Sequence, residues 1–212
     1  MKGMICQRIL LIGLMSLSVS AFAESSEQPD VHVGDRWAWQ HTNGLVNEMD
    51  RTQIEDVIEI TDKEIKTRVR VKGQPGSAVA VYSRDWSPID IVSARYAPLL
   101  KELDFPLQVG KKWNAEADKM LFSNGKHGKF FLKAEVAALE NITVPAGSFD
   151  AYRVNLSIEA AGTDEEANIG HTTEAIWYAP SVKRYVKLES TFARDGRVRS
   201  KDIFDLLEYS LR

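Results

Sequence analysis

Hydrophobic and polar residues alternate with a period of two along most of the chain after residue 30. The pattern is clearest at 152–159, where every second residue from Tyr152 to Ile158 is apolar and the residues between are polar. It recurs at 65–71 and 130–136. Because successive side chains of a strand point to opposite faces, this alternation predicts strands with one buried and one solvated face.

Further strands are predicted between turn signals. Thr61-Asp62-Lys63-Glu64 is a polar connection of hairpin length, and Asn-Gly or Asp-Gly pairs occur at 43–44, 124–125 and 195–196. The additional strands are expected at 35–41, 54–60, 78–83, 116–122, 172–178, 184–192 and 201–209. Together they indicate about ten strands in an all-β, mainly antiparallel domain, folded as a single curved sheet, a half-barrel or a sandwich.

No stretch sustains a long amphipathic helix. The sequence predicts a short helix at 98–103 that covers one open end, and a lid or cap formed by residues 86–101, which include Pro88, Pro98 and several apolar side chains. Residues from Ile203 onward also fit helical spacing, but we interpret them as a strand.

A short repeat suggests two sheet halves. Val33-Gly34-Asp35-Arg36-Trp37 and Val109-Gly110-Lys111-Lys112-Trp113 share Val-Gly-x-x-Trp, and each precedes a predicted strand. The glycine permits a tight entry into the strand, and the tryptophan supplies a large ring for the core.

Residues 1–23 have the features of a secretory signal peptide. Lys2 and Arg8 precede an apolar run from Ile9 to Val19, and Ala21-Phe22-Ala23 provides small residues for cleavage after Ala23. The apolar run is about half of the ~20 residues that a membrane-spanning helix needs, so no transmembrane anchor is expected in the mature form. We therefore expect a flexible segment at 24–30 and one β-rich domain at 31–212, located in the periplasm or secreted.

Charge and cysteine content exclude several classes of protein. Removing Lys2 and Arg8 leaves 25 basic and 30 acidic residues over 189 positions, a formal charge of −5, which argues against nucleic-acid binding. The one cysteine, Cys6, lies in the predicted signal peptide, so the mature chain is expected to have no disulfide and no thiol chemistry.

No catalytic or metal-binding pattern emerges from the mature sequence. There is no Gly-x-Ser-x-Gly motif, and the histidines at 32, 41, 127 and 171 are dispersed. Carboxylate groups such as Glu55-Asp56, Glu102/Asp104 and Asp164-Glu165-Glu166 are expected to be structural or hydrated, because neighbours in a strand face opposite sides. We predict a non-enzymatic protein without a metal or other cofactor.

The aromatic residues provide the candidate binding surface. Trp37 and Trp39 lie two positions apart on one predicted strand and share a face, and other rings lie on further strands. Such rings form either a filled core or the lining of an apolar pocket. The predicted ligand-binding residues are Trp37, Trp39, Trp113, Tyr152 and Trp177.

A family resemblance appears in the second half of the chain. Val144-Pro145-Ala146-Gly147-Ser148-Phe149-Asp150-Ala151-Tyr152 and Trp177-Tyr178-Ala179-Pro180, with Phe105-Pro106-Leu107-Gln108-Val109-Gly110 upstream, resemble exported bacterial proteins of the domain of unknown function 3108 family. The resemblance covers roughly residues 105–190. It implies a periplasmic, curved β fold and transfers no catalytic residue.

Three hypotheses for function follow. We favour a periplasmic protein whose concave β surface binds a lipid, an acyl chain or a hydrophobic peptide. The alternative is a structural subunit that contacts an envelope protein through a sheet edge or an exposed patch. A carbohydrate-active hydrolase is the third and has the least support.

Overall fold

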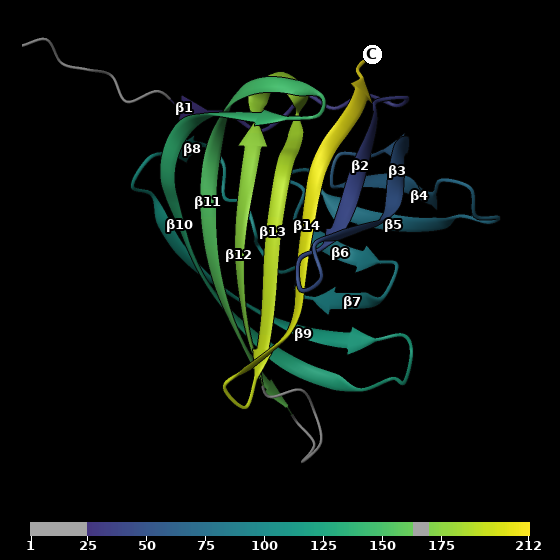
Figure 1. The fold of residues 1–212 in the computed structure, drawn as a ribbon. Helices are drawn as coiled ribbons and strands as arrows, with labels where there is room; N and C mark the ends of the chain where they lie inside the picture. The colour runs from purple at the N-terminus through teal and green to yellow at the C-terminus, as the bar shows by residue number, and fades with distance from the viewer. Residues whose placement is uncertain (1–24, 163–169) are drawn as a thin grey trace, which may run out of the picture.

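The computed structural model describes residues 25–162 and 170–212, and nearly all of its regular structure is β-strand (Figure 1). The predicted signal peptide and the residues Asp164-Glu165-Glu166 lie outside this range. The first strands are β1 (Ser25–Ser26), β2 (Arg36–Asn43), β3 (Glu48–Ile60), β4 (Glu64–Val71), β5 (Ala78–Ser83), β6 (Pro88–Ile91) and β7 (Ala94–Ala97). They are followed by β8 (Leu107–Gln108), β9 (Lys112–Leu121), β10 (His127–Val144), β11 (Gly147–Gly162), β12 (Gly170–Ala179), the 3₁₀ turn η1 (Pro180–Val182), β13 (Arg184–Arg194) and β14 (Arg197–Ser210).

All strands except β1 and β8 form one closed antiparallel barrel, in the order β10-β11-β12-β13-β14-β2-β3-β4-β5-β6-β7-β9. The prediction of an all-β, antiparallel fold is confirmed. The predicted open half-barrel or sandwich of about ten strands is corrected to a closed barrel of twelve. Closure depends on the pairing of β14 with β2 and of β7 with β9, which no local pattern in the sequence encodes.

The predicted cap is corrected in part. Residues 88–97 form β6 and β7, which belong to the barrel wall. The helix expected at 98–103 is absent, but Leu100 and Leu103 of this irregular segment are buried in the core. The residues from Ile203 that also fit helical spacing lie within β14, as predicted.

The repeated Val-Gly-x-x-Trp motif marks two similar halves of the barrel. The Gly34 amide donates to the carbonyl of Val57 at 2.9 Å, and the Gly110 amide donates to the carbonyl of Val136 at 2.8 Å. Both glycines have positive φ, at 95° and 88°. Six barrel strands follow each motif, β2 to β7 and β9 to β14, and the short strands β1 and β8 that precede them pair with each other.

An up-and-down barrel places alternate connections at opposite ends. The connections at 61–63, 84–87, 145–146 and 180–183 lie at one end, which we name the closed end. Those at 44–47, 72–77, 92–93, 122–126 and 195–196 lie at the other, named the open end, toward the lower and right-hand side of Figure 1. No helix in the described residues has the length and apolar character required to cross a membrane.

Candidate ligand-binding site

Inward-facing side chains of the barrel become more exposed to solvent toward the open end. In β12, Tyr178 and Ile176 are buried, whereas Glu174 and Thr172, which continue the same alternate positions, are half-buried. In β14, Leu206 is buried and Phe204 is half-buried. The strand register places inward residues of neighbouring strands side by side: Tyr178 pairs with the buried Tyr152, and Phe204 pairs with His41. Because these inward side chains are partly exposed, solvent reaches the inward face of the barrel near the open end.

A cavity of about 160 Å³ lies beside the core in this interior. Its walls combine aromatic and aliphatic side chains with two ionisable groups, Glu102 and Arg184. The apolar lining residues are Tyr82, Trp86, Pro88, Ile91, Leu103, Ile176, Tyr178, Tyr185 and Leu188. An apolar wall with a few fixed polar groups is the usual composition of a small-molecule binding site.

Arg184 is held by a carboxylate and by aromatic rings. Its Nη2 donates to Glu55 Oε2 at 3.1 Å, and both side chains are buried. The guanidinium carbon lies 3.8 Å from the ring centroid of Trp86 and 4.6 Å from that of Tyr82. Burial by itself lowers the pKa of Arg184, but Glu55, Tyr82 and Tyr185 together more than offset this and raise it.

Glu55 accepts a second hydrogen bond, from Thr67 Oγ1 at 2.6 Å, so each oxygen of its carboxylate has a protein donor. By contrast, the Nε atom of Arg184 is buried without a hydrogen-bond partner in the described structure. A buried N–H without an acceptor carries a free-energy penalty that a bound acceptor would remove.

Glu102 also interacts electrostatically with two further ionisable residues, Glu174 and Lys119. Burial, reinforced by the negative charge of Glu174, raises the pKa of Glu102 to about 8. The pKa of Glu174 is raised by burial as well, against the effect of the hydrogen bond that Ser190 Oγ donates to Oε1 at 2.9 Å. At neutral pH, Glu102 is therefore largely protonated and can donate a hydrogen bond.

Lys119 supplies the cation of this group. Its Nζ lies 4.9 Å from the ring centroid of Phe130 and 5.3 Å from that of Tyr96. Burial lowers the pKa of Lys119, and the charges of Glu174 and Glu102 act in the opposite direction. The interior therefore holds charged and protonated polar groups among apolar rings, and is not uniformly hydrophobic.

His41 lies buried on the same inward face. Its Nε2 lies 2.9 Å from Asp202 Oδ1, and its Nδ1 contacts Asp50 Oδ1. Its ring packs against that of Phe204 with centroids 4.6 Å apart. Because the two carboxylates approach the ring from opposite edges, the arrangement fixes the imidazole and does not gather ligands around one point. Across the described residues, no group of three or more His, Cys, Asp or Glu side chains could hold a metal ion.

The structure separates the five predicted ligand-binding residues. Trp37, Trp39 and Tyr152 are buried in the core. Trp113 is half-buried, and its Nε1 donates to the carbonyl of Lys101 at 2.8 Å. Trp177 pairs in register with Arg153, and its Nε1 donates to Glu140 Oε1 at 2.6 Å. The expectation that several of these residues share one concave surface does not hold for Trp177, which lies on the outer face. The role of the five residues in ligand binding stays a prediction.

The cavity residues were missed because they look ordinary in the sequence. Arg184 stands at a strand start, where charged residues are usually solvated. The expectation that Glu102 is hydrated is wrong, because Glu102 lines the cavity and burial raises the pKa of its carboxyl group. The sequence pattern assigns Trp86 only to the predicted lid. One expectation is confirmed: Glu55 and Asp56 face opposite sides, because Glu55 is buried inside while Asp56 pairs with Arg36 and Arg70.

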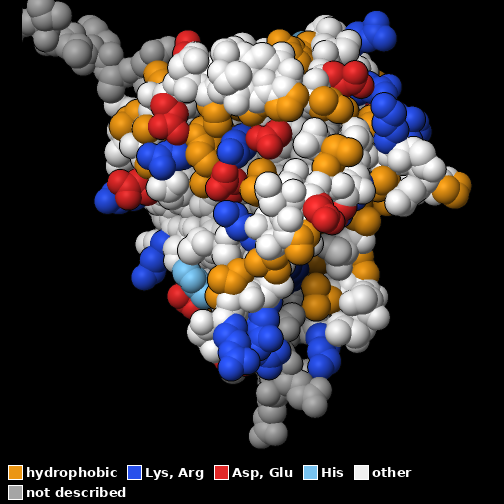
Figure 2. Space-filling model, viewed as in Figure 1, with side chains coloured by type: hydrophobic (Ala, Val, Ile, Leu, Met, Phe, Trp, Pro, Cys, Tyr) orange, Lys and Arg blue, Asp and Glu red, His pale blue; other side chains and the backbone are white. Residues whose placement is uncertain are grey.

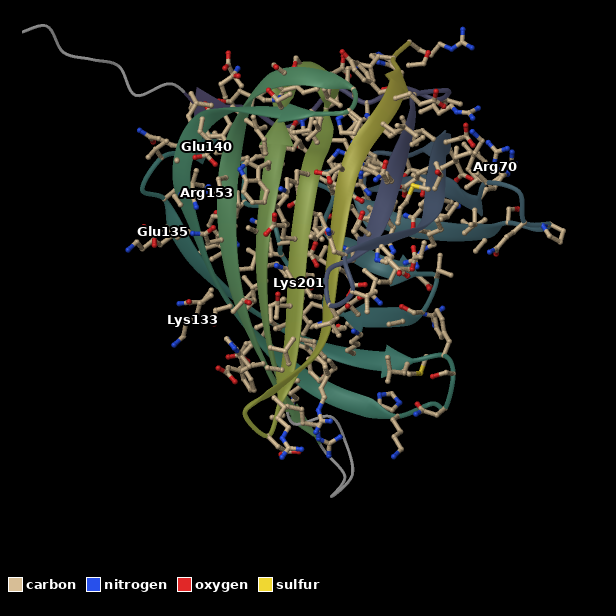
Figure 3. The ribbon with its side chains drawn as sticks, in the orientation of Figure 1. Arg70, Lys133, Glu135, Glu140, Arg153 and Lys201 are labelled. Atoms are coloured by element: carbon tan, nitrogen blue, oxygen red, sulfur yellow. The ribbon has the colours of Figure 1, made fainter. Side chains whose placement is uncertain are left out.

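Larger hollows lie outside the barrel interior. One, of about 490 Å³, lies over β9, β10 and β11 and is lined by Lys133, Glu135 and their neighbours. Figure 3 shows Lys133 and Glu135 pointing away from the barrel on its outer face. The other, of about 680 Å³, lies at the closed end between residues 25–30 and the start of β11. Both are broad surface depressions.

Comparison with known proteins supports the fold. No protein-family model matches the chain, and no curated protein matches it in sequence. The resemblance to the domain of unknown function 3108 family therefore stays a prediction.

Two solved structures match the fold. One is a protein from Parabacteroides distasonis inferred to be a lipoprotein, with a TM-score of 0.58 and 13% identity over 88% of this chain and 100% of that one. The other is a protein from Bacteroides fragilis inferred to be exported, with a YmcC-like fold, a TM-score of 0.57 and 13% identity over 88% and 99% of the two chains.

The chain thus belongs to the class of closed antiparallel barrels similar in fold to these two bacterial proteins. At this level of identity the likeness establishes the fold alone.

Proposed function

We propose that the protein is an exported, non-catalytic binding protein whose barrel interior receives an amphipathic ligand, such as a lipid or an acyl chain. The observation that carries the proposal is the apolar cavity of about 160 Å³ beside Arg184 and Glu102, in an interior accessible from the open end. Export is supported by the signal-peptide pattern of residues 1–23 and by the descriptions of the two structural neighbours.

The polar groups of the cavity specify the ligand further. The unpartnered Nε of Arg184 and the protonated carboxyl of Glu102 are both hydrogen-bond donors. They suit a head group rich in acceptors, such as the carboxylate or ester carbonyl of an acyl lipid. The apolar wall that includes Ile91 and Leu188 suits the hydrocarbon next to that head group.

The alternative function, an envelope subunit that binds a partner through a sheet edge, receives less support. Each of the twelve barrel strands has a hydrogen-bonded neighbour on both sides over part of its length, so among the described residues the barrel leaves short unpaired segments, such as the end of β10 after Val136, which pairs with β11 alone. A partner would have to use such a segment or the outer surface. The hydrolase hypothesis gains no support, because among the described residues Glu102 is the one carboxylic acid that lines the cavity.

Organic extraction of the natively purified protein tests the proposal. We expect the extract to contain acyl lipid in stoichiometric amount, and a fluorescent fatty-acid probe to bind the delipidated protein and to quench or shift its tryptophan emission, to which Trp86 in the cavity wall contributes. An extract without lipid, together with no binding of the probe, would remove the proposal. Capture of one envelope protein by crosslinking in intact cells would then favour the subunit hypothesis.

A further inference from the structure

The open end carries apolar side chains at the tips of its hairpins. Leu45 and Val46 occupy the β2–β3 connection and are 53% and 61% exposed. Val92 lies at the β6–β7 connection, and Phe122 at the β9–β10 connection. Met49 and Val198 lie close to connections at the same end and are also exposed. Exposed aliphatic and aromatic side chains therefore occur on four separate hairpins at this end, whereas a single exposed apolar residue would need no explanation.

Basic side chains lie among these tips. Arg194 and Arg197 flank the β13–β14 turn, and Arg199 and Lys201 continue along β14. Figure 2 shows Lys and Arg side chains gathered at the lower end of the molecule, where Figure 1 places the β13–β14 hairpin. Lys72 lies on the β4–β5 connection. The described hairpin at 194–202 holds four basic and two acidic residues, a local positive excess in a mature chain whose formal charge is negative.

We propose that the open end of the barrel is a docking surface for a lipid bilayer that contains anionic head groups. The apolar hairpin tips enter the boundary between head groups and acyl chains, and the arginines and lysines of the β13–β14 hairpin contact the lipid phosphates. The interior accessible at this end would then face the bilayer directly.

The arrangement of the tips favours a bilayer over a protein partner. A stable protein interface buries a continuous, shape-complementary surface whose fully buried core is more apolar than its rim. Here single apolar residues project from separate hairpins with polar and basic residues between them, which is the composition of surfaces that insert shallowly into lipid. The surface stands independently of the interior site, because binding to vesicles does not require a ligand in the cavity.

Vesicle flotation tests this surface, using the purified mature protein and vesicles of either phosphatidylcholine alone or a mixture with phosphatidylglycerol. The test variant is the double substitution Val46→Asn and Phe122→Asn at the open end. The matched control is Val33→Asn and Val109→Asn, whose valines are 56% and 48% exposed in the turns of the two Val-Gly-x-x-Trp motifs. Circular dichroism establishes that all variants keep the barrel.

The unmodified protein is expected to float with the phosphatidylglycerol vesicles. The open-end variant should partition at least about tenfold more weakly, since each buried apolar side chain contributes to binding, while the control should match the unmodified protein. Arg197→Glu with Arg199→Glu should reduce binding to the anionic vesicles and weaken its dependence on salt. Failure of the unmodified protein to bind either vesicle, or equal losses in test and control variants, would overturn the proposal.

These outcomes are separate from those of the interior site. A protein that binds the fatty-acid probe but floats with no vesicle keeps the proposed function and loses the docking surface. A protein that floats but yields no lipid and binds no probe does the reverse.

Discussion

Arg184 at the start of β13 donates a hydrogen bond to Glu55 of β3 at 3.1 Å, and the two residues meet inside the barrel although 129 positions separate them in the chain. Both side chains are buried, so neither charge can be solvated if the other is removed. The pair thereby links the two six-strand halves of the barrel, and its arginine lines the candidate site.

Removing one member of this pair should destabilise the protein strongly. Arg184→Met leaves the Glu55 carboxylate buried without its cation, and we expect the free energy of unfolding to fall by about 3–5 kcal/mol. The double variant Arg184→Met with Glu55→Gln should be more stable than the single one, because no uncompensated charge remains. Urea denaturation followed by tryptophan fluorescence measures both; equal stability of the single variant and the unmodified protein would show that the pair is not buried in solution.

The stability of the protein should decrease with rising pH because of Glu102. Its pKa of about 8 in the folded protein lies above the ordinary value of 4.5, so the native state binds more protons than the unfolded state between these values. The stabilising contribution is complete below pH 4.5 and is lost as pH rises through 8. Denaturation at a series of pH values should show this decrease, and Glu102→Gln should make the profile flatter in the same window.

Three other charged groups affect the pH of that transition. Glu174 raises the pKa of Glu102, whereas Arg184 and Lys119 lower it. Glu174→Gln should therefore move the midpoint of the Glu102 titration to lower pH, measured by carboxyl-carbon NMR. An unchanged midpoint would show that the two carboxyl groups do not interact.

A larger side chain on β13 should weaken ligand binding only where it faces the cavity. Leu188 lines the cavity, while its neighbour Lys187 lies on the outer face beside Trp177, with Nζ 5.4 Å from the ring centroid. Leu188→Trp should fill part of the cavity and weaken binding of the fatty-acid probe at least about tenfold, since a packed interior tolerates added volume poorly. Lys187→Trp is the matched control and should leave the affinity unchanged. Equal effects of the two substitutions would place the binding site elsewhere.

The two glycines of the repeated motif should differ in their tolerance of a side chain. Both have positive φ, so alanine at either position costs about 1 kcal/mol in backbone strain. At Gly110 a Cβ meets nothing within 4 Å, whereas at Gly34 it meets Arg212 Cγ at 3.2 Å. The melting temperature of Gly34→Ala should therefore be equal to or lower than that of Gly110→Ala. A higher melting temperature for Gly34→Ala would contradict the described packing of Arg212.

The sequence pattern predicted the strands better than the site. Alternation identified the regions of β4, β10 and β11 because one face of each meets a dry core and the other meets water. Closure escaped prediction because the pairing of Trp39 with Leu206, in β2 and β14, joins residues from the two ends of the domain. Local hydrophobicity carries no record of such partners.

The candidate site was harder to predict for two physical reasons. Bulges shift the alternation, as between Val57 and Glu59 of β3, so the inward positions no longer follow the apolar ones. In addition, Glu55 and Glu174 face the interior as charged or protonated groups, and a pattern that assigns polar residues to solvent places them outside. The aromatic residues at 37 and 39 were correctly placed on one inward face, but they fill the core.

Photocrosslinking with a fatty acid that carries a diazirine in its acyl chain tests the central claim most directly. The account predicts that, after proteolysis and mass spectrometry, the label lies on inward residues near the cavity, such as Leu188 and Ile176, and that excess unlabelled fatty acid prevents the labelling. Label confined to Lys133 and its neighbours over β9, β10 and β11, or no label that competes, would contradict an interior binding site.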